Sequence, residues 1–151
     1  MYVCYMKKML FLSLLALTVI TACKKDSLGT KPVITFKSYS SAPIMANFGL
    51  DVTFVVKDGD GDIQNALNFA AIYDTAPTDT GFTSRPMPGL DAHAGTSLTA
   101  DVILHLVGTD FPQIGANPVL KDSVHFLVYI VDDKSNHSDT IATPKVEILY
   151  Q

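Results

Sequence analysis

The regular alternation of apolar and polar residues is the feature that most restricts how this chain folds. In LDVTFVVK (50–57), every second side chain from Leu50 to Val56 is apolar. The same period of two recurs in LTADVILHLV (98–107) and in VHFLVYIV (124–131). A period of two is typical of a β-strand that buries one face, whereas a helix would repeat every 3.6 residues. The sequence therefore predicts a protein built mainly from β-strands.

Shorter β-like stretches lie near Ile34, from Leu67 to Tyr73, around Phe82 and from Val146 to Tyr150. Together these patterns predict about seven strands, separated by clusters of Gly, Pro, Asp, Asn and Ser, and no long helix. One apolar face per strand favours an all-β, antiparallel β-sandwich that is Ig-like in architecture, of the immunoglobulin or fibronectin type III kind. The inward positions predict a core that includes Val52, Phe54, Val102, Leu104, Phe126, Val128 and Ile148.

The first 22 residues have the composition of a signal peptide. Lys7 and Lys8 precede an apolar run from Met9 to Ile20, and small residues lead to Cys23. The run is too short to span a bilayer comfortably, and it ends at a site suited to cleavage. We expect a leader over 1–22, a polar tether over 23–30 and one domain over 31–151.

The tetrapeptide Ile20-Thr21-Ala22-Cys23 resembles the lipobox of bacterial lipoproteins. The resemblance implies that signal peptidase II cleaves between Ala22 and Cys23 and that Cys23 carries the lipid. Acyl chains contribute about 0.8 kcal/mol per buried methylene, so several chains anchor a protein stably to a membrane. Lys24 replaces the aspartate that retains such proteins in the inner membrane of enteric bacteria, which favours the outer membrane of the cell envelope. The alternative is an ordinary secretory signal that happens to contain a cysteine.

Composition excludes several kinds of chemistry. The two cysteines are Cys4, in the leader, and Cys23, so the domain has no thiol for a disulfide, a zinc site or a nucleophile. Two of the 11 lysines and arginines leave with the leader but none of the 15 acids, so the mature net charge is −6. That charge argues against nucleic acid as a partner.

The segment KDGDGDI (57–63) follows the first strong strand pattern and contains three closely spaced aspartates. Asp58, Asp60 and Asp62 have the spacing that opens an EF-hand loop, but Ile63 stands where that loop needs Gly and Phe69 where it needs Glu. A looser calcium site remains open as an alternative. Asp132 and Asp133 would contribute to it if their loop shared the same end of the sandwich. The simpler interpretation, which we favour, is a turn whose glycines permit positive φ and whose aspartates cap it.

A catalytic role for these carboxylates is not favoured by the sequence. A general acid needs a raised pKa from burial, and we expect a glycine-spaced loop to expose its side chains. The sequence also contains no HExxH, GxSxG, P-loop or GxGxxG motif. The expected cofactor is therefore none, with calcium as the alternative.

Two stretches resemble small Bacteroidetes lipoproteins with an Ig-like domain. One is the strand followed by DGDGDI and a second strand from Asn68 to Asp74. The other is IVDDKSNHSDTIATPKVEI (130–148), which is similar to the "DxxGNxSNT…TP" ending of such domains. Ser135 stands where that ending usually has Gly, and Asp139 where Asn is frequent. The resemblance implies the sandwich fold and specifies no activity.

Three function classes follow from these observations. The favoured class is a non-catalytic binding or scaffold module, anchored to the membrane and presenting its loops to a glycan, peptide or protein. The second is an accessory subunit of an outer-membrane uptake or secretion complex, and the third is a small hydrolase. His105 and His125 would form a transition-metal site only if their strands paired. Tyr39, Phe82 and Tyr129 are candidates for a binding surface or for the core.

Overall fold

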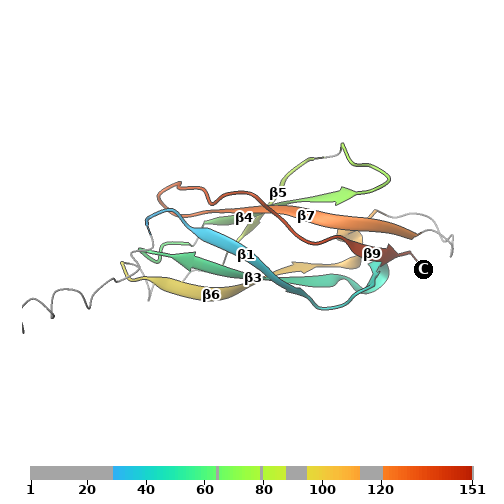
Figure 1. Ribbon diagram of the computed structural model, residues 1–151, viewed down its shortest axis with the longest axis horizontal. Helices are drawn as coiled ribbons and strands as arrows, with labels where there is room; N and C mark the ends of the chain where they lie inside the picture. Colours follow the sequence, from blue (N-terminus) through green and yellow to red (C-terminus); the bar gives the residue numbers. More distant parts are fainter. Residues whose placement is uncertain (1–28, 64, 79, 88–94, 113–120, 151) are drawn as a thin grey trace, which may run out of the picture.

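Two β-sheets face each other across a shared apolar core (Figure 1). The structure is a computed structural model that describes residues 29–63, 65–78, 80–87, 95–112 and 121–150. Its elements in chain order are β1 (Val33–Tyr39), β2 (Ile44–Met45), the 3-10 helix η1 (Ala46–Phe48), β3 (Leu50–Asp58), β4 (Ala66–Tyr73), β5 (Thr83–Pro86), β6 (Leu98–Leu106), the 3-10 helix η3 (Gly108–Asp110), β7 (Lys121–Val131), β8 (Ile141–Ala142) and β9 (Val146–Leu149).

The first sheet has the order β1-β3-β6, and the second has the order β2-β9-β7-β4-β5 with β8 paired to β7. All these pairings are antiparallel except the parallel pair β2–β9. The prediction of an all-β, Ig-like sandwich is therefore confirmed, and each of the seven expected strands is present. The sequence did not reveal β2 and β8, because two residues are too few to show a period.

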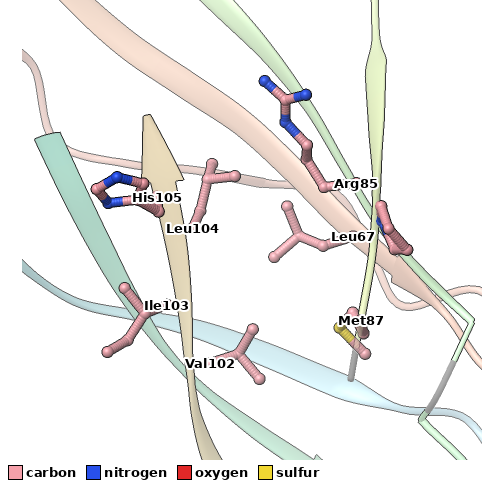
Figure 2. A pocket seen from close by; sticks show the side chains of 8 residues that line it. Leu67, Arg85, Met87, Val102, Ile103, Leu104 and His105 are labelled. Atoms are coloured by element: carbon pink, nitrogen blue, oxygen red, sulfur yellow. The ribbon is translucent and has the colours of Figure 1, made fainter. Parts of the chain in front are cut away.

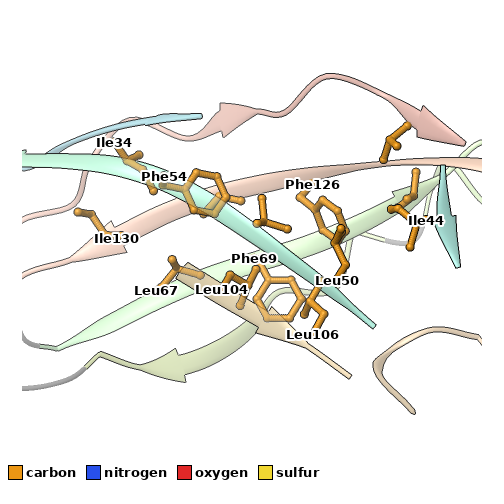
Figure 3. Packing of buried hydrophobic residues seen from close by; sticks show 14 of the residues in the cluster. Ile34, Ile44, Leu50, Phe54, Leu67, Phe69, Leu104, Leu106, Phe126 and Ile130 are labelled. Carbon is orange, nitrogen blue, oxygen red and sulfur yellow. The ribbon is translucent and has the colours of Figure 1, made fainter. Parts of the chain in front are cut away.

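The core consists of the inward positions of the strands, as the alternation predicted (Figure 3). Phe54 of β3 and Phe126 of β7 are both fully buried. Val102 differs from the prediction because it is only half-buried. It lies on β6, an edge strand, and lines the open side of the sandwich next to β5. The six other predicted core residues are buried: Val52, Phe54, Leu104, Phe126, Val128 and Ile148.

Tyr39 links the two sheets. Its ring lies 6.3 Å from that of Phe126, and its hydroxyl donates to the carbonyl of Pro144 at 2.6 Å. The hydroxyls of Tyr39 and Thr143 are hydrogen-bonded at 2.6 Å, and the Thr143 hydroxyl accepts the amide N–H of Phe126 at 2.8 Å. Of the two roles considered for Tyr39, the structure shows the core role.

One end of the sandwich gathers three segments that are distant in sequence. Val33 at the start of β1 pairs with Lys57 near the end of β3, which brings the N-terminal end of the domain beside the DGDGDI loop. The side chain of Asn136, in the β7–β8 loop, donates to the carbonyl of Thr30 at 3.3 Å. The C-terminal strand β9 ends at the opposite end of the molecule (Figure 1).

Candidate functional site

The aspartates of the DGDGDI loop are buried more deeply than a glycine-spaced loop suggests. Asp58 is the last residue of β3 and continues the inward series of that strand, so its side chain points into the sandwich. Asp58 is fully buried and Asp62 is 7% exposed. The expectation that this loop exposes its carboxylates is therefore wrong for both residues. Ile63 is buried in the core, as expected.

The three carboxylates converge on one point. One oxygen from each of Asp58, Asp60 and Asp62 lies within 4.8 Å of the other two. The turn is held by the amide N–H of Asp62, which donates to Asp58 Oδ2 at 3.0 Å, and by Gly61, whose φ of 71° is readily adopted only by glycine. The predicted turn and the possible cation site are thus the same structure.

Lys134 from the β7–β8 loop closes the open side of this cluster. Its ammonium group contacts the Asp60 carboxylate and lies 2.8 Å from Asp62 Oδ2. The hydrogen bond from Lys134 lowers the pKa of Asp60, and both aspartates raise the pKa of Lys134. The pKa of Asp58 is raised, mainly by burial and further by the negative charges of Asp60 and Asp62. Lys134 thus stabilises the ionised form of Asp60, whereas Asp58 remains in an environment that disfavours its charge.

The β7–β8 loop does share this end of the sandwich, but its aspartates have other roles. Asp132 is fully buried, and its two carboxylate oxygens accept the backbone N–H and the side-chain amide of Asn136 at 2.7 and 2.8 Å. Asp133 is exposed, and its backbone N–H donates to the Asp62 carbonyl at 2.9 Å. Asp132 therefore shapes its own loop, and Asp133 joins that loop to DGDGDI through the main chain.

Sequence reasoning missed Lys134 and the burial of Asp58. The period-two pattern of β3 already placed Asp58 on the inward face, so that signal was present in the sequence. Nothing local in the sequence pairs Lys134 with Asp60, because the two residues are 74 positions apart. The proposed lipidation site at Cys23 and the cleavage position after Ala22 lie outside the described residues.

His105 and His125 are on strands of different sheets, β6 and β7, so the strand pairing needed for a two-histidine metal site does not occur. His105 Nδ1 lies 2.5 Å from a carboxylate oxygen of Asp51 on the adjacent strand β3. His125 is half-buried on β7, opposite Ile72.

A groove lies on the open side of the sandwich, where edge strand β5 of one sheet faces edge strand β6 of the other (Figure 2). It is open to solvent, with a volume of about 320 Å³. One wall carries Leu67 and Met87, and the other carries Val102 and Leu104. Arg85, which is ion-paired with Asp110 at 2.7 Å, adds a charged group, whereas the side chains of Ile103 and His105 point away from the groove on the outer face of β6 (Figure 2). The groove is thus mainly apolar with one charged residue beside it, and small-molecule and peptide sites are commonly apolar with few polar groups.

Aromatic side chains also gather on the second sheet. The rings of Phe82 and Tyr129 are 5.2 Å apart, and the ring of His137 stacks on Tyr129 at 5.7 Å. Phe82 is 44% exposed and Tyr129 is half-buried, so part of this cluster is accessible from solvent.

Comparison with known proteins adds a fold-level likeness only. No protein-family model matches the chain, and neither does any curated protein. Among solved structures, the chain is similar to a Niemann-Pick type C2 protein from the Japanese carpenter ant, with a TM-score of 0.34 and 12% identity, covering 82% of this chain and 96% of that one. Within the described ranges, no helix has the length and apolar character needed to cross a membrane.

Proposed function

We propose that this chain is a lipid-anchored, non-catalytic binding module of the bacterial cell envelope, and that its partner occupies the groove between β5 and β6. The observation that supports this proposal most directly is the groove itself. Its volume of about 320 Å³ and its apolar walls match the lower end of known ligand sites, about 300–1,000 Å³. The candidate partners remain a glycan, a peptide or a protein.

The position of the tether is compatible with this role. If Cys23 carries the lipid, Thr30 follows it by seven positions, a reach of at most about 25 Å. Thr30 lies at the end of the sandwich that carries the DGDGDI loop. A lipid anchor would therefore hold that end close to the membrane. The groove runs along one side of the sandwich, so a partner in solution would still reach it.

The anchor is tested by expressing the wild type and Cys23→Ser with their own leader. We expect the wild type to enter the detergent phase and to incorporate an alkyne-palmitate label, and the variant to do neither. Equal labelling of both proteins would contradict lipidation at Cys23.

The binding role is tested by screening the chain from residue 24 onward on glycan and peptide arrays. Val102, which is half-buried and whose side chain points into the groove, provides the test variant, Val102→Asp (Figure 2). Val33, an exposed apolar residue on β1 away from the groove, provides the control, Val33→Asp, and circular dichroism checks that both variants are folded. We expect Val102→Asp to weaken binding at least about tenfold, equivalent to ~1.4 kcal/mol, and Val33→Asp to leave it unchanged. Equal losses in both variants would refute the groove as the site. Turnover of a glycan or peptide substrate by the chain would refute the non-catalytic role.

A further inference from the structure

The carboxylates of Asp58, Asp60 and Asp62 are not fully compensated by their surroundings. The Oδ1 atoms of all three are buried and accept no hydrogen bond from the described residues. Burying a carboxylate without partners is costly, and three converging negative charges add mutual repulsion. A positive charge placed among the three carboxylates would therefore stabilise the cluster.

Lys134 neutralises only part of this negative charge. Its ammonium pairs with Asp60 and Asp62, and no ion pair to Asp58 is seen among the described residues. Its side chain is 61% exposed, so the ammonium approaches from solvent and can turn away without disturbing the core. Asp58 is fully buried, its Oδ1 has no hydrogen-bond partner among the described residues, and one of its oxygens belongs to the set of three that lie within 4.8 Å of one another.

We propose that Asp58, Asp60 and Asp62 bind a calcium ion at this centre, and that Lys134 occupies the site as a substitute cation when calcium is absent. Calcium takes oxygen ligands at 2.3–2.6 Å, so two of its ligands can be about 5 Å apart. The three oxygens lie within 4.8 Å of one another, which already satisfies that limit. Magnesium, at 2.0–2.1 Å, would require them to be within about 4.2 Å. Water completes the coordination, because calcium needs six to eight ligands.

The ion would hold the DGDGDI loop in the conformation that bonds to its two neighbours, the segment at Gly95 and the β7–β8 loop. The Asp60 carbonyl accepts the amide N–H of Gly95 at 2.6 Å, and the Asp62 carbonyl accepts that of Asp133. Neutralising the cluster stabilises the main-chain conformation that makes both bonds. This inference concerns the stability of the end that carries the DGDGDI loop and depends neither on the lipid anchor nor on the groove being the partner site.

The test uses the chain from residue 24 to 151, which contains both sheets and their whole core, after removal of metal with a chelator. Thermal melts are recorded with CaCl₂, with MgCl₂ and with NaCl at equal ionic strength, and calcium binding is titrated by calorimetry. Extracellular modules bind calcium at about 10⁻⁴–10⁻³ M, and we expect the same range here. At a calcium concentration ten times Kd, Tm should rise by about 5 °C.

Variants distinguish calcium binding at this site from a general effect of calcium on an acidic protein. Asp60→Asn and Asp62→Asn should each abolish the calcium-dependent rise. Asp101→Asn, which removes an exposed carboxylate paired with Lys37 on the first sheet, should retain it in full. Lys134→Gln should lower Tm without calcium and tighten calcium binding several-fold, because the competing cation is gone.

Several results would overturn the proposal. The first is a calorimetric titration of the wild type that shows no binding of one calcium per chain. The others are a rise in Tm no larger than with NaCl, an equal rise with magnesium, or weaker calcium binding by Lys134→Gln than by the wild type. The wild-type titration decides the question even if an aspartate variant does not fold.

Discussion

The backbone N–H of Asp133 donates a 2.9 Å hydrogen bond to the carbonyl of Asp62, and this bond joins two loops that are distant in the sequence. Through it, the β7–β8 loop lies against the turn that follows β3, and Lys134 reaches the carboxylates of that turn. The acidic cluster, the lysine that pairs with it and the start of the domain are therefore held at one end of the sandwich.

Phe126 should be essential to the core. Its side chain is fully buried between the sheets, and its ring packs against Tyr39. We expect Phe126→Ala to lower the free energy of unfolding by about 3–5 kcal/mol, because a large cavity replaces the ring. Lys57→Ala, on the outward face of β3, should change it by less than about 0.5 kcal/mol. Urea unfolding followed by circular dichroism measures both values, and similar losses in the two variants would contradict the assigned faces of the strands.

Replacing Ser135 with glycine should stabilise the fold. Ser135 has a φ of 66°, in the left-handed region that costs a non-glycine residue about 1–2 kcal/mol. Part of that gain is offset by the greater freedom of glycine in the unfolded chain. We expect Ser135→Gly to stabilise the fold by about 0.5–1 kcal/mol. The control Ser84→Gly, in strand β5, should destabilise it instead, and a loss of stability in both would show that the Ser135 side chain has a role of its own.

The negative charge of Asp58 should reduce the stability of the metal-free protein. Its pKa is raised in the fold, so its charge opposes folding at neutral pH, and this penalty is relieved as pH falls through the folded pKa. Asp60 behaves in the opposite way. Its lowered pKa contributes stability above the ordinary value of 3.8 that is lost as pH falls through the folded pKa.

Asp58→Asn removes the buried negative charge of Asp58 and keeps an oxygen to accept the N–H of Asp62. We therefore expect Asp58→Asn to raise Tm at pH 7 without calcium, and to make the decrease in Tm on acidification steeper than in the wild type. Melts between pH 7 and the ordinary Asp value of 3.8 measure both changes. A lower Tm at pH 7 would mean that the Asp58 charge stabilises the metal-free fold.

The sequence alone determined the strands and their faces. Alternation is a local property of each strand, so it predicted the buried positions of β3 and β7 and most of those of β6. The same alternation continues to Asp58, but the glycine spacing of DGDGDI led us to expect a turn with exposed carboxylates, whereas Asp58 and Asp62 are buried.

Only the tertiary structure decided which segments meet. It placed β6 and β7 in different sheets, which separates His105 from His125, and it brought Lys134 to Asp60 and Asp62. Val102 is only half-buried because its strand lies at the edge of a sheet, and which strand lies at an edge depends on strand pairing and not on the pattern within a strand. Pairing between strands depends on the packing of the whole core, and that information is spread over residues far apart in the chain.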